Sequence, residues 1–487
     1  MKELQSLSLL FLAIYFVLLV GGIFYTRKSK DSVDYFLGGR KLPFWTISIA
    51  FIASWWGAGS AIETADKAYN EGISAFMIYG MPVLFSAFMI YIFSKAIRKI
   101  GTITQPQLLE ERYGKLAAYL LSVLIFIFMT VSAAGQMVAI GDFFDTFLGI
   151  NYTWGVIIGT AIVVLYSSVG GFRGVVITDI IQFVFLLITS LLLFGIAYYH
   201  SGGWSNIQDI ALNNNKTDYN DITSGFSKNV IYVITFGAAW MIQANVWQRI
   251  SATRTPEDAK KMIGTSFLTF IPLYLMVTLT GMFALGLFDK MPEEGIIMGI
   301  ITNYMSPVLG ALMFIGISSA VMSTMDSLIN TGALVLSVDI HKKIKEDKLS
   351  SKQLVLSGKI STLIVSLIAI IIGLRIRSIL DVSWIAADFI ATGAFVPIVL
   401  GFLWKKGNHK AAVASMIFGI LFPTYNLFIS LGIDLPSAWE HGSAQQVLIG
   451  MSGSLILYTI VSIFTKSNEA KANQFIRKAE LIKSKAS

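Results

Sequence analysis

A face of oxygen-bearing side chains lies inside a long apolar segment in the second half of the chain. On this segment, over 308–338, Ser323, Asp326, Ser327 and Asn330 follow one another at i, i+3, i+4 and i+7. That spacing places all four on one side of a helix. Hard cations prefer oxygen ligands, and hydroxyls together with backbone carbonyls supply oxygen at low charge. The pattern predicts a site for a hard monovalent cation.

The same residue types also have a packing role. Ser and Thr side chains hydrogen-bond neighbouring helices inside membranes, and that interpretation is favoured for Ser318 and Ser319. Thr324 and Thr331 flank the polar face. For Ser323 and Thr324 the residues alone leave ion binding and helix packing both open.

Ionisable side chains stand out inside the other apolar segments. Asp179 lies one turn into a segment over 175–198, and Asp388 lies in a segment over 380–404. A charge inside a membrane is costly, so each such residue is a functional candidate. Together with Asp326, they form the set of buried acids that we expect to take part in function.

The segment over 43–64 has an unusual centre. It reads IASWWGAGSAIET and places Gly57, Ala58, Gly59 and Ser60 near the middle of the membrane. Small residues there permit close helix packing or an unwound stretch whose carbonyls face a ligand. From these residues alone, packing is the safer interpretation.

The composition indicates that these residues are held by membrane-spanning helices. Only 14% of the 487 residues are charged and 55% are hydrophobic, whereas soluble domains carry roughly 25% charged residues. A membrane-spanning helix needs about 20 mostly apolar residues, because hydrocarbon cannot hydrogen-bond a bare backbone. We therefore predict an all-α integral membrane protein of about thirteen transmembrane helices. The predicted helices cover 7–25, 43–64, 73–94, 117–147, 153–168, 175–198, 229–248, 262–288, 308–338, 355–374, 380–404, 411–431 and 446–465.

Other classes of site are disfavoured. The chain has no Cys and four His, which excludes a disulfide framework and thiolate metal sites and argues against a His-rich centre. The net charge of +8 would suggest nucleic acid in a soluble protein, but here basic residues are expected on the cytoplasmic side. We expect no nucleic-acid partner and no obligate protein partner.

The basic loops predict the orientation. If the loop after the first helix is inside, the inside segments hold 30 of the 37 Lys and Arg residues. Residues 249–261 are counted among these inside segments. The positive-inside rule then places the N-terminus outside and the C-terminus in the cytoplasm, which requires an odd number of helices. The first helix lacks a basic start and a cleavage site, so we do not expect a cleaved signal peptide.

Three segments in order resemble the sodium:solute symporter family. They are ASWWGAGSAIETADKAYNEG over 53–72, YSSVGGFRGVVITDIIQ over 166–182 and SSAVMSTMDSLIN over 318–330. The resemblance covers nearly the whole chain, and the helix plan also matches. It implies a leucine-transporter-like core of two five-helix inverted repeats, over 43–198 and 229–404, within one transmembrane domain spanning 1–487. Helix 7–25 and the helices over 411–465 would be peripheral, with a cytoplasmic tail over 466–487.

The resemblance also implies where sodium binds. In such folds broken helices meet near the midplane, and here the helices over 43–64 and 229–248 would be the broken pair. The main sodium site of the family maps to the carbonyls of Ala53, Trp56 and Ala320 and the hydroxyls of Ser323 and Thr324. A second sodium site, found in some members, maps to Asp179, Asp326 and Ser327.

The solute site is implied less sharply. Its candidates by resemblance and proximity are Ser54, Trp55, Gly57, Ser60, Phe85, Trp240, Gln243, Trp247 and Asp388. Locally the chain looks closest to the choline transporters, whose ligand is held by ring faces. Gln243 and Ser132 replace two of the caging aromatics, which argues for a solute with hydrogen-bonding groups.

We therefore predict a sodium-coupled symporter in the cell membrane that imports a small organic solute by alternating access. An amino acid such as proline is favoured; a choline-like amine, pantothenate, a sugar or sialic acid are alternatives. A solute sensor or a channel are the rival classes, and no nucleophile–base pair suggests an enzyme. The sequence does not choose between one and two sodium ions per cycle.

Overall fold

The computed structural model describes residues 2–24, 32–346, 348–430, 432–439 and 443–479. Over these residues the secondary structure is helical and contains no strand. A helix satisfies its own backbone hydrogen bonds, which is what an apolar surrounding demands. The predicted helix ends at residues 25 and 431 and the last part of the predicted tail, 480–487, lie outside the described residues.

One or more helices overlap each of the predicted spans. They are α1 (Lys2–Phe24), α3 (Phe44–Trp55), α5 (Gly80–Ile100), α7 (Lys115–Leu148), α8 (Tyr152–His200), α10 (Phe226–Met241), α11 (Ala244–Ala252), α12 (Pro256–Phe283), α14 (Pro307–Leu334), α16 (Ser351–Arg375), α17 (Ile379–Ile390), α18 (Val396–Leu403), α19 (His409–Ser430) and α20 (Ala444–Phe464).

Other helices connect or extend them. They are α2 (Ser32–Leu37), α4 (Thr64–Glu71), α6 (Gln105–Tyr113), α9 (Gly203–Asn213), α13 (Ile296–Tyr304), α15 (Lys342–Ile344) and α21 (Glu469–Ala479). Three 3₁₀ turns are η1 (Gly38–Arg40), η3 (Gly72–Met77) and η4 (Ala284–Gly286), and three π-helical turns are η2 (Gly59–Glu63), η5 (Val335–His341) and η6 (Ala391–Phe395).

The predicted number of about thirteen crossings is not confirmed. Among the described residues, ten helices are long and apolar enough to cross a membrane, or eleven if the bent pair α10–α11 forms one span. The apolar helices Phe44–Trp55 and Tyr152–Ser168 are shorter. The predicted spans 153–168 and 175–198 both fall within α8, where Gly171 adopts φ 53° and ψ −157° and marks a kink. Such a backbone conformation is open almost only to glycine.

Two helices are broken where the resemblance implied it. Helix α3 ends at Trp55, Trp56 has φ −92° and ψ 69°, and the helix resumes as π-helical turns at Gly59. Helices α10 and α11 form a pair bent by 46°. Both predicted breaks are therefore confirmed.

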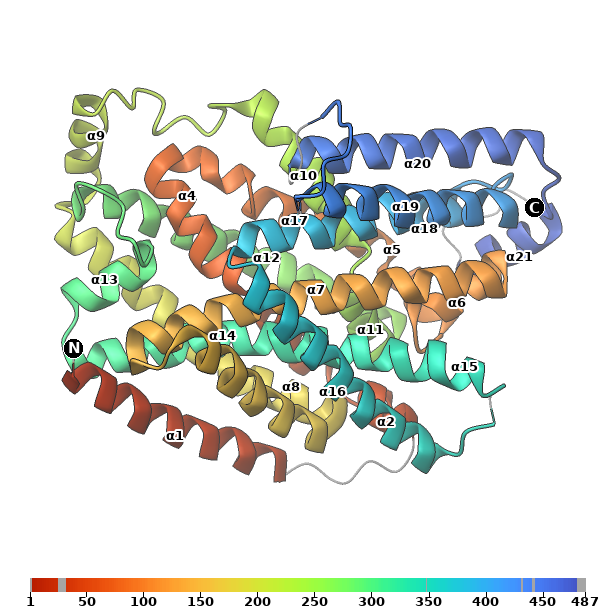
Figure 1. Cartoon of the computed structure of the whole chain (residues 1–487), viewed down its shortest axis with the longest axis horizontal. Helices are drawn as coiled ribbons and strands as arrows, with labels where there is room; N and C mark the ends of the chain where they lie inside the picture. The colour runs from red at the N-terminus through yellow and green to blue at the C-terminus, as the bar shows by residue number, and fades with distance from the viewer. Residues whose placement is uncertain (1, 25–31, 347, 431, 440–442, 480–487) are drawn as a thin grey trace.

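Helix α14 lies at the centre of the molecule. It packs on α7, α8, α16, α1 and α3, and most of its residues are buried. In Figure 1, α7 and α14 cross the middle of the view, while α1 lies along the lower left edge and α20 along the upper right. Helices α1, α19 and α20, like the second half of α8, bury far fewer of their residues than α14 does.

The first and last helices begin and end at opposite ends of the bundle. Figure 1 shows the start of α1 at the left with α9 and α13, and α21 at the right with α6 and α15. Helix α21 is amphipathic and packs on α5, α6 and α18, with Phe475 and Ile476 buried.

Candidate functional site

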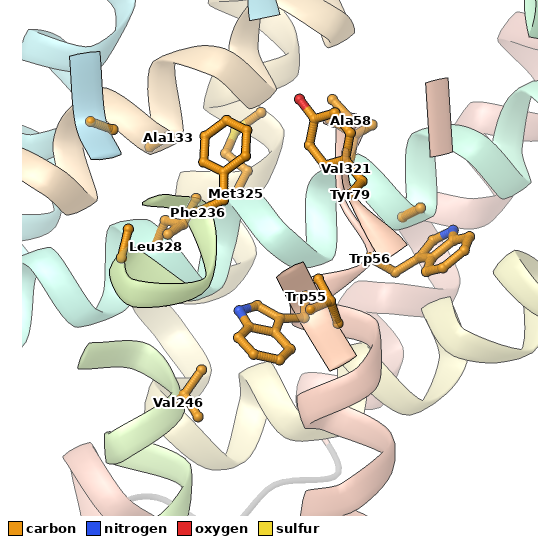
Figure 2. Close-up of a cluster of buried hydrophobic side chains, with 14 of the residues drawn as sticks. Trp55, Trp56, Ala58, Tyr79, Ala133, Phe236, Val246, Val321, Met325 and Leu328 are labelled. Atoms are coloured by element: carbon orange, nitrogen blue, oxygen red, sulfur yellow. The ribbon is translucent and has the colours of Figure 1, made fainter. Parts of the chain in front are cut away.

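The break in α3 exposes backbone groups at the centre of the bundle. Figure 2 shows the indole rings of Trp55 and Trp56 leading in opposite directions from the end of α3. Beyond them the amide N–H of Ala58 donates to Gln136 Oε1 on α7 at 2.9 Å. A buried backbone donor needs a partner, so Gln136 helps to hold the unwound stretch in place.

A cavity of about 80 Å³ lies beside this break. Five of the predicted solute residues line it: Trp55, Gly57, Ser60, Trp240 and Gln243. The lining also includes Thr324 and Leu328 of α14 and a set of polar residues from other helices, which are Tyr79, Ser132, Gln136, Tyr274 and Ser383. Residues distant in the sequence are thus brought to one small space.

Hydrogen bonds fix several of the lining groups. The Trp55 indole N–H donates to Gln243 Oε1 across the two broken helices. The hydroxyls of Ser60 and Tyr274 lie 2.6 Å apart. The Tyr79 hydroxyl is buried and makes no hydrogen bond with any described residue. Because Trp55 uses the acceptor of the Gln243 amide, the two N–H donors of that amide are left for a ligand.

One wall of the cavity is aromatic. The Trp240 ring stacks on Phe236 with centroids 4.8 Å apart and faces Tyr79 at 5.9 Å. On the other side, Trp55 contacts Phe51 and Phe270 at 4.8 and 5.6 Å. Among the described residues that line the cavity, none is charged. The cavity therefore suits a small solute without net charge that has both an apolar part and hydrogen-bonding groups.

The predicted main sodium residues meet where α3 and α14 touch. Thr324 lines the cavity and donates to the Ala320 carbonyl at 3.2 Å. A Cβ atom built on Gly57 would lie 2.9 Å from the Thr324 hydroxyl oxygen, so the unwound chain passes directly against this residue. Ala53 and Trp56 are buried at the end of α3. The Ser323 hydroxyl, one residue before Thr324, donates to Asp179 Oδ1.

The residues of the predicted second sodium site are also close together. Asp326 accepts from the hydroxyl of Ser327 at 3.1 Å and from that of Tyr166 at 2.8 Å. Arg249 lies among them: one guanidinium nitrogen donates to Asp179 Oδ2 at 3.1 Å and to Ser327 Oγ at 2.7 Å. Asp179, Asp326 and Arg249 are all buried, with exposed fractions of 0%, 0% and 1%.

Two predicted solute residues lie off the cavity because they face the wrong side of their helices. Ser54 donates to the Phe51 carbonyl within α3. Phe85 packs against Gly237 of α10, and it stands two residues after Val83, which lines the cavity. Two residues correspond to about 200° around a helix, so Phe85 points away.

Trp247 and Asp388 also lie off the cavity. The Trp247 indole donates to the Met241 carbonyl at 3.0 Å, because the bend between α10 and α11 interrupts the helical spacing from Gln243. Asp388 accepts from Thr392 at 3.0 Å, from Asn426 at 3.2 Å and from Gln446. Its partners on α19 and α20 hold it against the outer helices. The arrangement therefore does not support the predicted solute contact for these residues.

Several residues at the site were not predicted as site residues. Gln136 and Tyr274 lie in long apolar helices. A polar side chain within an apolar segment is the feature of the sequence that could have identified them. Arg249 was counted with the cytoplasmic loop over 249–261, but α11 continues to Ala252 and carries Arg249 into the interior. That assignment was wrong because the helix extends one turn further than its apolar run.

Known proteins match the chain over most of its length. A model of the sodium:solute symporter family matches residues 35–419. The chain is 29% identical to the osmoregulated proline transporter OpuE of Bacillus subtilis, covering 95% of both, and 27% identical to the high-affinity proline transporter PutP of the same organism, covering 94% and 98%. It is 22% identical to the sodium/glucose cotransporter of Vibrio parahaemolyticus, covering 96% and 92%.

Solved structures give the fold. A Na⁺-coupled sialic acid symporter in a substrate-bound outward-open state superposes with a TM-score of 0.80 at 19% identity, covering 95% of this chain and 99% of the other. MhsT in complex with L-phenylalanine gives a TM-score of 0.51 at 14% identity, covering 86% and 97%. The predicted leucine-transporter-like fold is confirmed. The chain belongs to the sodium:solute symporter family and is a sodium-coupled symporter, a multi-pass membrane transporter and not an enzyme.

Proposed function

We propose that this symporter takes up proline, or an amino acid of similar size, and binds it in the central cavity. Proline transporters are the more similar of the relatives, at 29% and 27% identity, and the glucose cotransporter is less similar at 22%. The chemistry of the cavity points the same way. A zwitterionic amino acid carries no net charge, and none of the described lining residues is charged.

The polar groups suit a carboxylate better than a quaternary amine. The amide N–H donors of Gln243 are free of Trp55 and can donate to a ligand oxygen. A trimethylammonium group offers no acceptor and is held by ring faces instead. A buried amide without a partner costs about 1–3 kcal/mol. The rings of Trp55 and Trp240 can pack on the apolar ring of a bound proline.

Sodium is proposed to bind at Ala53, Trp56, Ala320, Ser323 and Thr324, between the broken end of α3 and α14. The observation that carries the proposal is the position of Thr324, which belongs to this set and also lines the cavity. A cation there would tie the unwound chain beside Gly57 to α14 and so complete one wall of the solute site. Solute affinity would then depend on sodium, which is the linkage that symport requires.

Alternating access would change the contacts on the proposed inner side of the cavity, where α11 meets α2 and α6 meets the α10–α11 break. Gln105 of α6 donates to the Ile242 carbonyl at the α10–α11 break at 3.0 Å. Gln248 of α11 donates to the Phe36 carbonyl of α2 at 2.9 Å. We propose that these bonds hold α11 closed on the inner side and break when the inner gate opens. Sodium would shift the population toward the outward-facing state by binding that state more tightly.

We place the symporter in the cell membrane with the N-terminus outside and the C-terminus in the cytoplasm. The distribution of Lys and Arg among the loops supports this orientation. The start of α1 and helix α21 lie at opposite ends of the bundle, which is consistent with an odd number of crossings (Figure 1).

The test is uptake of labelled proline by proteoliposomes with an inward sodium gradient, repeated with potassium in place of sodium. We expect sodium-dependent accumulation, with competition by unlabelled proline and weak competition by glucose, sialic acid, pantothenate and choline. A different competitor that suppresses uptake more strongly than proline would replace proline as the substrate. Flux that ignores the sodium gradient would indicate a channel, and sodium-dependent binding without any flux would indicate a sensor.

A further inference from the structure

Arg249 is a buried cation in direct contact with residues of the proposed ion sites. It lies on α11 with an exposed fraction of 1%, and its guanidinium carbon stands 6.0 Å from the centre of the Phe172 ring. Its Nη2 bonds both Asp179 and Ser327, its Nη1 donates to the Asn245 carbonyl at 3.4 Å, and its Nε has no hydrogen-bond partner among the described residues. A charge this deep is retained only with charged and hydrogen-bonded partners.

Two of its partners, Asp179 and Ser327, are residues that the resemblance assigned to a second sodium ion. We propose that Arg249 is the resident cation of that second site, so that the symporter couples one sodium ion, held at the main site, to each solute. The proposal rests on sodium-coupled symport and does not depend on proline being the solute.

The oxygen atoms of the second site are already in use. Ser327 Oγ accepts from Arg249 and donates its own proton to Asp326. The second oxygen of Asp326 accepts from Tyr166. A sodium ion placed there would share Asp179 and Ser327 with the guanidinium and would lie beside a like charge in a medium that screens it poorly.

The formal charges also balance with one ion. When both carboxyl groups are ionised, Asp179 and Asp326 contribute two negative charges and Arg249 contributes one positive charge. The proposed main site consists of carbonyls and hydroxyls and has no charge of its own. One sodium ion at that site brings the sum to zero, whereas a second ion would leave an excess positive charge inside the membrane.

The contacts further connect Arg249 to the main site. Ser323 donates its proton to Asp179, and this leaves the lone pairs of its oxygen for sodium. Arg249 holds the other oxygen of the same carboxylate. Because Arg249 lies on α11, beyond the break that we assign to the inner gate, a movement of α11 would disturb the carboxylate that orients a sodium ligand. Arg249 is therefore a positioning residue as well as a charge.

The experiment measures sodium binding to purified protein without solute, by radioactive sodium binding and by thermal shift in sodium chloride against N-methylglucamine chloride. Wild type and Arg249→Lys should bind about one sodium ion per protein molecule. Arg249→Ala vacates the place of the guanidinium and leaves two carboxylates, so it should bind about two ions per molecule. Arg249→Ala combined with Asp326→Asn removes the extra negative charge and should return the number of bound ions to about one.

Two ions bound by the wild type would overturn the proposal even if no variant folds. A folded Arg249→Ala protein that still binds a single ion, with unchanged affinity, would also overturn it. Because no solute is present, these outcomes are independent of the uptake experiment with proline. A failure to transport proline would leave the one-ion result intact.

Discussion

Thr324→Ala tests the proposed sodium site against a matched control on the same helix. Both Thr324 and Ser319 are buried in α14, and each hydroxyl donates to the carbonyl four residues before it, at 3.2 Å to Ala320 and at 2.7 Å to Ile315. Ser319→Ala removes the same kind of helix bond without touching the proposed ion. The two variants should therefore lose similar stability, and only Thr324→Ala should change the response to sodium.

The expected rise in the half-saturating sodium concentration can be estimated from the bonds that each variant removes. Loss of one neutral oxygen ligand is worth about 1 kcal/mol, or roughly a fivefold rise in the half-saturating sodium concentration. Ser323→Ala should have a larger effect, because the Ser323 hydroxyl is oriented by its bond to the Asp179 carboxylate. A bond to a charged group is worth about 1.5–3 kcal/mol, which corresponds to roughly ten- to a hundredfold.

The assay is sodium titration of solute uptake in proteoliposomes, with the melting temperature of each variant measured in sodium-free detergent. Thr324→Ser keeps the hydroxyl and should restore the sodium response close to that of the wild type. Equal shifts in Thr324→Ala and Ser319→Ala would remove Thr324 from the ion site. A smaller effect in Ser323→Ala than in Thr324→Ala would refute the role given to Asp179.

Three further changes separate the cavity from its surroundings. Gln243→Leu should raise the half-saturating proline concentration roughly ten- to a hundredfold, since it removes donors to a carboxylate worth roughly 1.5–3 kcal/mol; an unchanged value would place the carboxylate elsewhere. Gly57→Ala should lower uptake in folded protein, because its Cβ would lie 2.6 Å from Gln136 Oε1 and displace the oxygen that accepts from Ala58. Gly195→Ala, with no atom within 4 Å, should transport normally, and equal uptake by both variants would refute the close approach. Asp388→Asn should lower the melting temperature and leave the proline concentration dependence unchanged, and a weaker proline response at normal stability would return Asp388 to the solute site.

The helices were predictable because the membrane restricts the choices. An apolar run of sufficient length in a chain with few charges has to form a helix, and the ranges predicted from hydropathy coincide with helices throughout. The breaks in α3 and between α10 and α11 were indicated by the resemblance, whereas the small residues Gly57 to Ser60 alone favoured close helix packing. The number of crossings was not fixed, because Phe44–Trp55 and Tyr152–Ser168 are shorter than a full span.

The solute site was only partly predictable. Trp55, Gly57 and Ser60 follow from the position of the break in α3, and their neighbourhood could be inferred from it. The orientation of Phe85 depends on which face of α5 turns inward, and that of Trp247 depends on the bend after Met241. Hydropathy reports neither quantity, since both faces of a buried helix are apolar.

Arg249 was assigned to a loop because the positive-inside rule counts basic residues without asking whether they are buried. The positive-inside rule adds up basic residues near helix ends, and Arg249 lies at such an end. Its assignment depends on whether α11 stops before or after it. The sequence contained a signal that was not used: Asp179 and Asp326 are two buried acids, and a buried acid requires a positive partner or a proton. A search for that partner would have pointed to the nearest basic residue on a broken helix.

The buried polar network connects the parts of the fold that have to move relative to one another. Asp179 lies on α8, Ser323 and Ser327 lie on α14, and Arg249 lies on α11. The unwound end of α3 contacts α14 at Thr324, the residue after Ser323. Each bond in this series crosses from one helix to another, so none can persist unchanged if the helices shift. Buried polar groups cost stability unless they are fully paired, and an opening of the inner gate would therefore be sensed at the sodium ligands through a short chain of direct contacts.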